Sequence, residues 1–153
     1  MSERYRRSEE LLARAERTIP LGTQTFSKSK TQFPYGVSPF YAARAQGSRL
    51  WDADGNEYID FISSLASVTL GYNDPDVTAA VRAQLEKGVI FSLPTELELQ
   101  VSELLIELVP SAERARFGKN GSDATAGAIR VARAFTGRDR VAVCGYHGWQ
   151  DWY

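Results

Sequence analysis

The sequence is short of several residue types, and each scarcity excludes a class of protein. Cys144 is the only cysteine in 153 residues, so no disulfide can form within the chain and a reducing compartment is expected. The formal net charge of −1 gives no basic field to attract nucleic acid or an anionic membrane. No apolar run approaches the length of a membrane span, and the N-terminus lacks the apolar core of a signal peptide. We therefore expect a cytoplasmic globular protein that binds neither nucleic acid nor membrane.

The first third of the chain predicts a helix, an irregular stretch and a hairpin. Residues 3–18 are rich in Glu, Arg, Leu and Ala, which favours a helix that ends before Pro20. Residues 20–40 hold several prolines and glycines and predict a loop that wraps over another part of the protein. Residues 49–61 are typical of a β-hairpin around the acidic turn 52–56. That turn lacks the glycine position and the final glutamate of an EF-hand, so we predict no calcium site there.

Two further helices are marked by their N-terminal caps. Asp74 followed by Pro75 is typical of a helix start, and Gly88 supplies a stop. Thr95 with Glu98 three residues later makes a capping box for the second helix. Both helices carry apolar residues at helical spacing and should pack on one face.

The last third has the pattern of a βαβ unit. Residues 115–117 and 141–144 are strand candidates, and residues 122–136 predict a helix closed by Gly137. Such a unit implies a parallel sheet with a right-handed crossover. Two strands do not make a stable parallel sheet, so we expect the sheet to continue beyond residue 153.

The loop before the predicted helix 122–136 is a candidate anion site. Gly118 and Gly121 let the backbone turn tightly, and Ser122 is a good N-cap residue. Free N–H groups at a helix N-terminus favour a phosphate. The glycine spacing fits neither a Walker loop nor a dinucleotide-binding loop, and an ordinary capped loop between a strand and a helix explains the pattern as well.

A second candidate lies just after the second predicted strand. Ligands of open α/β sheets bind beyond the carboxyl ends of the strands, so Ser122 and Tyr146 are expected to face one pocket. The Tyr146 ring could stack on a flat heterocycle there. His147, the only histidine, fits a catalytic role or a structural hydrogen bond equally well. The following aromatic residues suggest a hydrophobic lid or a subunit contact: Trp149, Trp152 and Tyr153.

Several short stretches, in their order and spacing, resemble class III aminotransferases of pyridoxal-phosphate (PLP) fold type I, and in particular the glutamate-1-semialdehyde 2,1-aminomutases. These stretches are residues 50–55, 58–61, 70–75, 94–96, 107–110 and 134–139. The resemblance implies an α/β protein of the PLP-dependent transferase fold. Residues 1–88 would be an N-terminal segment, a helix plus a β-hairpin, that contributes to the small domain and to dimer contacts. Residues 89–153 would begin the large parallel-sheet domain that binds PLP.

The resemblance also implies a cofactor site. Asn120, Gly121 and Ser122 align with the family's phosphate loop and would hold the PLP phosphate through backbone N–H groups and the Ser122 hydroxyl. Lys119 stands where the family has asparagine. Tyr146 would stack on the pyridine ring, and His147 would lie nearby.

Two departures from the family bear on function. Ser63, Ser64 and Leu65 align with a Gly-Ser-Trp motif on the substrate side of the aminomutase, and the loss of its tryptophan favours an aminotransferase with another substrate. The catalytic lysine and the aspartate that pairs with the pyridinium nitrogen are expected beyond residue 153, so these residues alone should be an inactive part of a PLP enzyme. The resemblance implies a homodimer that uses a small-molecule amino donor and a carbonyl acceptor. The alternatives are a non-catalytic module for phosphate ligands and a segment that serves only as a subunit interface.

Overall fold

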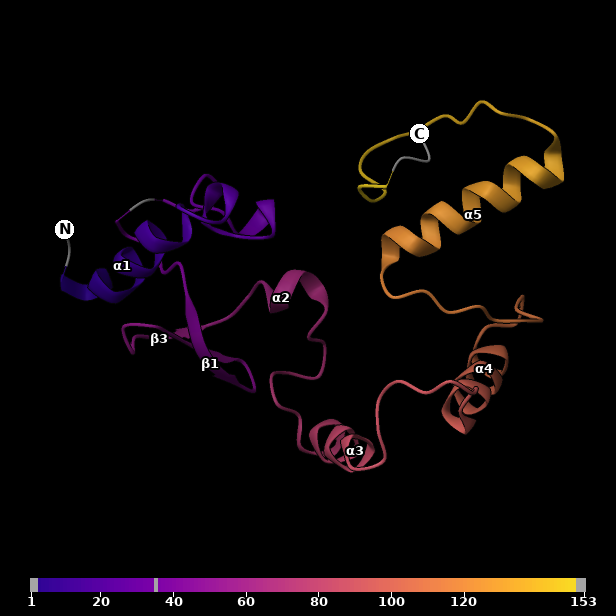
Figure 1. The fold of residues 1–153 in the computed structure, drawn as a ribbon, viewed down its shortest axis with the longest axis horizontal. Helices are drawn as coiled ribbons and strands as arrows, with labels where there is room; N and C mark the ends of the chain where they lie inside the picture. Colours follow the sequence, from indigo (N-terminus) through magenta and orange to yellow (C-terminus); the bar gives the residue numbers. More distant parts are fainter. Residues whose placement is uncertain (1–2, 35, 151–153) are drawn as a thin grey trace. The chain divides into compact units, whose positions relative to one another are not determined.

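The computed structural model describes residues 3–34 and 36–150, and the chain divides after Val89 into two compact units (Figure 1). The first unit contains η1 (Glu3–Tyr5), α1 (Arg6–Ala15), η2 (Pro20–Gly22), η3 (Phe26–Lys28), β1 (Ala42–Gln46), β2 (Arg49–Asp52), β3 (Glu57–Ile59), α2 (Ser63–Ala66) and α3 (Pro75–Leu85). The second contains α4 (Glu96–Leu108) and α5 (Gly121–Thr136). The assignment of these parts to a small and a large domain stays a prediction.

A three-stranded antiparallel sheet with the order β1-β2-β3 organises the first unit. The predicted hairpin is confirmed, because β2 pairs with β3 across the acidic turn, with Leu50 opposite Tyr58. Strand β1 was not predicted. It pairs with β2 from Ala42 opposite Asp52 to Gln46 opposite Arg49. It contains no β-branched or aromatic residue, the types that favour strands, so its pairing with β2 and not its own composition makes it a strand.

The buried carboxylate of Asp52 holds the hairpin turn. This residue is 1% exposed, and its Oδ1 atom accepts hydrogen bonds from the backbone N–H groups of Asp54 at 3.0 Å and Asn56 at 2.8 Å. Its Oδ2 atom accepts from the Tyr58 hydroxyl at 2.8 Å and from the Asn56 side chain at 2.9 Å. Burial, together with hydrogen bonds to Tyr5 and Asp52, raises the pKa of Tyr58. A buried carboxylate needs such donors, and here they come from the turn and from β3.

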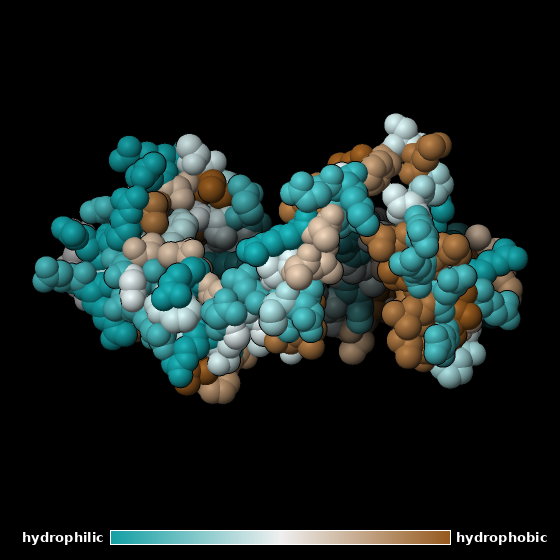
Figure 2. Space-filling model, turned by 90° about the horizontal axis from the view of Figure 1, so that it is seen from below, coloured by the Kyte–Doolittle hydropathy of each residue, from teal (hydrophilic) through white to brown (hydrophobic). Residues whose placement is uncertain are grey.

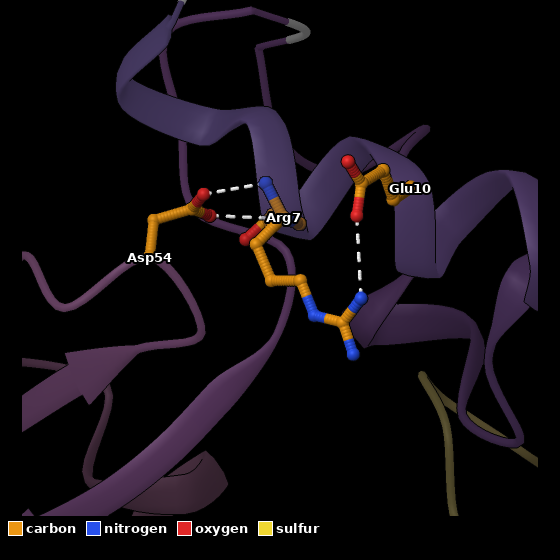
Figure 3. A network of polar contacts seen from close by, with 4 residues as sticks. Arg7, Glu10 and Asp54 are labelled. Carbon is orange, nitrogen blue, oxygen red and sulfur yellow. Dashed lines mark hydrogen bonds and ion pairs between the residues drawn. The ribbon is translucent and has the colours of Figure 1, made fainter.

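The same turn caps helix α1 (Figure 3). The Asp54 carboxylate accepts hydrogen bonds from the backbone N–H groups of Arg7 at 2.5 Å and Ser8 at 2.9 Å, at the N-terminus of α1. The residue before α1, Tyr5, provides no side-chain cap. Asp54 therefore satisfies N–H groups that have no partner inside the helix, and it joins α1 to the hairpin.

The predicted helix starts at Asp74 and Thr95 are confirmed. The Asp74 carboxylate accepts from the backbone N–H groups of Asp76 and Val77, both at 3.1 Å, and α3 begins at Pro75. Thr95 and Glu98 form the capping box of α4. The first predicted helix is shorter than expected, because α1 ends at Ala15 and the following residues form turns. None of the described helices is long and apolar enough to cross a membrane.

The predicted strands at 115–117 and 141–144 are wrong for this structure, which forms no backbone ladder at either stretch. Phe117, Val141 and Val143 are 47%, 37% and 46% exposed, so neither stretch is covered on both faces. An apolar stretch becomes a strand only when another strand lies beside it, and the residues described in the second unit include none. Figure 2 shows hydrophobic side chains gathered over α4, whose leucines are also exposed.

The Asp54 cap makes a prediction about stability. The D54A variant should lower the free energy of unfolding by about 1 kcal/mol, the usual cost of removing a helix cap. Urea denaturation at neutral pH measures it. The control is E10Q, because the exposed ion pair of Glu10 with Arg7 at 3.2 Å should change stability by less than about 0.5 kcal/mol. Equal midpoints for the two variants would show that the cap does not stabilise α1.

The cap should also depend on pH. Burial raises the pKa of Asp54, but hydrogen bonds from Ser8 and Arg7 outweigh it, so the pKa lies below its ordinary value. A lowered pKa means that the stabilisation is complete above the ordinary value and is lost as the pH falls through the folded-state value. The stability difference between the wild type and D54N should therefore be constant near neutral pH and shrink below about pH 4.

Candidate functional site

The turn before α5 is built by Asn120 and Asp123. Asn120 has an extended backbone, and its side-chain oxygen accepts a hydrogen bond from the Asp123 N–H at 3.0 Å. In return, the Asp123 carboxylate accepts from the Asn120 N–H at 3.2 Å and from the Lys119 N–H at 3.1 Å. This reciprocal box corrects the sequence-based prediction that Ser122 is the N-cap. Asn120 caps the helix because its side-chain oxygen accepts from the N–H group three residues later, in the first turn of α5.

The box leaves the backbone N–H groups of Gly121 and Ser122 without an acceptor among the described residues. Both groups belong to the first turn of a 16-residue helix, where the positive end of the helix dipole favours an anion. A Cβ atom added to Gly121 would have no neighbour within 4 Å, so this side of the turn is open. The turn thus has the free donors and the space that a phosphate needs.

The other side of the turn is closed by residues 147–148. A Cβ atom on Gly148 would lie 2.8 Å from Ser122 Oγ and 3.1 Å from Ser122 Cα, and the φ of Gly148 is +108°. The Thr125 hydroxyl lies 3.1 Å from the carbonyl oxygen of Ser122 and 2.9 Å from that of His147, so its one hydrogen is shared between them. Gln150 donates to the Asp123 carboxylate at 2.5 Å. The structure therefore brings Ser122 and the segment after residue 144 together.

The two predicted site residues of that segment, Tyr146 and His147, have different surroundings. His147 Nε2 lies 2.7 Å from the carbonyl oxygen of Cys144. A carbonyl only accepts, so Nε2 carries the proton and the ring holds its own loop. Tyr146 is 78% exposed, which leaves most of its ring available to a ligand. Trp149 is 72% exposed, and Trp152 and Tyr153 lie outside the described residues. The roles predicted for Tyr146 and His147 in a cofactor site stay predictions.

Ser64 and Leu65 lie in the first unit, within an unusual turn. Every residue from Ser63 to Ala66 has a positive φ, between 49° and 66°, and none is a glycine. Such left-handed backbone costs about 1–2 kcal/mol per residue, so the surrounding contacts must hold it. The Asp60 carboxylate accepts from the N–H groups of Ile62 at 2.8 Å and Ser63 at 3.2 Å, and from the Tyr72 hydroxyl at 2.5 Å.

Sequence reasoning did not single out four residues that shape the turn before α5 and the left-handed turn Ser63–Ala66. They are Asp60, Tyr72, Thr125 and Gly148. Gly148 follows the predicted Tyr146 and His147, and its type alone indicated a tight turn. Asp60 and Tyr72 make their contact across 12 residues, and Thr125 and His147 across 22. No local pattern predicts contacts at such separations.

The class of this protein follows from comparison with known proteins. The class-III aminotransferase family profile matches residues 32–151, and the chain belongs to that family. It is 42% identical over 154 aligned residues to a glutamate-1-semialdehyde 2,1-aminomutase of Desulforamulus reducens, which covers 99% of this chain and 35% of the relative. The chain thus spans about a third of the length of the curated relatives that it matches.

Two solved structures extend the comparison. An omega-transaminase from Sphaerobacter thermophilus is 40% identical, with a TM-score of 0.84 over 94% of this chain and 32% of that one. The FumI protein of Sphingopyxis sp. MTA144, solved in a form that carries PLP, is 39% identical, with a TM-score of 0.87 over 94% of this chain and 34% of that one. These likenesses confirm the predicted fold class, the N-terminal segment of a fold type I PLP-dependent enzyme.

The close approach of Gly148 to Ser122 generates a further prediction about stability. G148A should destabilise the protein by about 1–3 kcal/mol more than G145A, because only the former inserts a methyl group against α5. Gly145 is the matched control: its φ is also positive, at +89°, but a Cβ atom there would have no neighbour within 4 Å. Urea denaturation gives the stabilities. Similar losses in both variants would mean that backbone strain, and not contact with Ser122, fixes Gly148.

Proposed function

We propose that the whole protein to which this chain belongs is a PLP-dependent aminotransferase, that Gly121 and Ser122 bind the cofactor's phosphate, and that Asn120, whose N–H is bonded to Asp123 and is not free as the sequence predicted, positions them. The observation that carries the proposal is the pair of N–H groups on Gly121 and Ser122, at the start of α5, that have no acceptor among the described residues. A doubly charged phosphate fits there, because the donors are free, the helix dipole has the right sign and the Gly121 side is open. When bound, PLP supplies the electron sink that amino-group transfer requires.

Each residue of the turn has its own part in this proposal. The Asn120–Asp123 box fixes the turn, so that the N–H groups of Gly121 and Ser122 point to one place. The Ser122 hydroxyl, half-buried beside Gly148, is a further donor. The exposed Tyr146 ring, two residues before Gly148, is the proposed partner of the pyridine ring. The catalytic lysine and the pyridinium-pairing aspartate are expected outside this sequence.

The proposed partners are a small-molecule amino donor, a carbonyl acceptor and a second copy of the protein. We place the protein in the cytoplasm, which suits its single free and exposed Cys144. Residues 20–40 are candidates for the dimer contact. The described residues of this stretch form short 3-10 turns at Pro20–Gly22 and Phe26–Lys28 and little other regular structure.

The full-length protein should be purified yellow, and S122A should weaken PLP binding. Loss of one hydrogen bond to a charged phosphate costs about 1.5–3 kcal/mol, which corresponds to a dissociation constant about tenfold higher or more. The visible absorbance during PLP titration of the apoprotein measures it. S102A is the matched control, because the Ser102 hydroxyl donates to the Glu98 carbonyl oxygen within α4 at 2.8 Å.

A colourless protein that binds inorganic phosphate at this turn would instead support a non-catalytic phosphate-binding module. Borohydride reduction gives an independent check, since it should leave the cofactor covalently attached to a PLP enzyme. An S122A variant with unchanged PLP affinity would remove the turn from the cofactor site.

Glutamate-1-semialdehyde aminomutase is the second candidate function, favoured by the 42% identity to the Desulforamulus reducens relative. The aminotransferase is preferred because Leu65 occupies the position of the aminomutase tryptophan. A substrate screen of the full-length enzyme separates the two. We expect turnover of an amino donor with a separate carbonyl acceptor that exceeds any conversion of glutamate 1-semialdehyde. Efficient conversion of glutamate 1-semialdehyde without an added acceptor would reverse the preference.

A further inference from the structure

The left-handed turn from Ser63 to Ala66 is held by a side-chain pair that has no part in the proposed phosphate site. The two carboxylate oxygens of Asp60 accept hydrogen bonds from different partners. Oδ1 accepts from the Ile62 and Ser63 N–H groups at the start of the turn, and Oδ2 accepts from the Tyr72 hydroxyl at 2.5 Å. The Asp60 carboxylate thus lies between the strained backbone and a fixed tyrosine.

Tyr72 is fixed because its backbone is bonded to the hairpin. Its N–H and carbonyl groups both pair with Gly47, each at 2.8 Å. A Cβ atom on the neighbouring Gly71 would lie 3.2 Å from Gly47, so the two backbones touch. The next residue, Asn73, donates from its side chain to the Ala45 carbonyl oxygen at 2.8 Å. The Tyr72 hydroxyl therefore reaches Asp60 from a position set by β1 and the turn that follows it.

The Asp60 backbone is tied to the same place, because its N–H donates to the Ser48 carbonyl oxygen at 2.9 Å. The hydrogen bond from Tyr72, more than any other influence, lowers the pKa of Asp60, so its side chain stays anionic and keeps accepting from the turn. Beyond the pair, the turn leaves Leu65 54% exposed while Ser63 and Ser64 are half-buried. The turn that donates these hydrogen bonds from its start is therefore one that exposes Leu65.

We propose that Asp60 and Tyr72 are positioning residues that hold the turn Ser63–Ala66 in its left-handed form and so set the selectivity for the amine substrate. The proposal rests on the proposed function, since it takes Ser64 and Leu65 as substrate-side residues. Strained backbone persists only where the surroundings enforce it, and such strain is concentrated at ligand sites. An apolar side chain at Leu65 suits an amine with an apolar substituent more than one that carries a second carboxylate.

The test compares Y72F with Y58F in the full-length protein loaded with PLP. Both variants remove a tyrosine hydroxyl that donates to an aspartate in the first unit, but the Tyr58 hydroxyl serves Asp52 in the hairpin, at 2.8 Å. Stopped-flow measurement of the loss of visible cofactor absorbance gives a maximal rate and a half-saturating concentration for each amine. The amines are 1-phenylethylamine, which is bulky and apolar, and alanine, which is small. Hydrogen exchange over residues 60–72 gives a readout that needs no activity.

We expect faster exchange at the turn in Y72F, and a half-saturating concentration of 1-phenylethylamine about tenfold higher, the factor that loss of one hydrogen bond to a charged group brings. The maximal rate and the PLP content should change by less than about twofold, which identifies a loss of binding and not of chemistry. The value for alanine should also change by less than about twofold. Y58F should leave both half-saturating concentrations unchanged.

A second substitution tests whether the backbone conformation is the cause. Ala66 has a φ of +66°, where glycine is favoured over alanine. The double variant Y72F/A66G should therefore recover part of the selectivity that Y72F loses. The proposal is overturned if Y72F loosens the turn but leaves amine selectivity as in Y58F, or if exchange at the turn does not depend on Tyr72. A wild-type protein without PLP would refute the proposed function, and this selectivity role with it, even if exchange still depended on Tyr72.

Discussion

The structure depends above all on how each helix satisfies the backbone N–H groups at its N-terminus, which have no partner within the helix. Helix α1 receives a carboxylate from the distant Asp54, α3 uses its own Asp74, and α4 uses the box of Thr95 with Glu98. Helices α1 and α3 thus begin on carboxylates that occupy their donors. The boxes of α4 and α5 leave the N–H groups of their first two residues without an acceptor among the described residues, namely Glu96 and Leu97 in α4 and Gly121 and Ser122 in α5. Helix α5 differs because it begins with a glycine on an open side where α4 has the acidic Glu96, so the start of α5 suits an anionic ligand better.

In the first unit, where little apolar surface is buried, aspartate side chains hold the turns and a helix start in place. The buried apolar residues described there are Tyr5 and Leu12, while Asp52 is also buried. Each of Asp52, Asp54 and Asp60 accepts backbone N–H groups and so fixes a turn or a helix start. A carboxylate can accept several hydrogen bonds at once, so one side chain can determine a whole turn. The hairpin therefore provides the frame from which both α1 and the left-handed turn are positioned.

Features set by neighbouring residues could be predicted from the sequence, and features set by distant contacts could not. Asp74 with Pro75, Thr95 with Glu98 and Gly137 each act within one helical turn, and each was placed correctly. The α5 cap was misassigned to Ser122, although the turn predicted before this helix is present, with Asn120 as its cap. A cap is chosen by geometry among nearby polar residues, and the sequence offered both Asn120 and Ser122. Strand β1 and the Asp60–Tyr72 contact depend on partners far along the chain, so no local pattern indicates them.

The apolar stretches without a partner strand also show that structure depends on distant contacts, because here those contacts are missing. Val141 and Val143 have the composition of a buried parallel strand but remain partly exposed without a ladder, and α4 leaves Leu97 and Leu108 47% and 67% exposed. Strand pairing and burial are collective, so the same residues would form a strand only beside a partner strand. The turn before α5 is different, because its backbone is fixed by Asn120 and Asp123, which are close in sequence. The N–H groups of Gly121 and Ser122 therefore lack an acceptor among the described residues even without a surrounding sheet, and the phosphate site proposed there depends on local contacts alone.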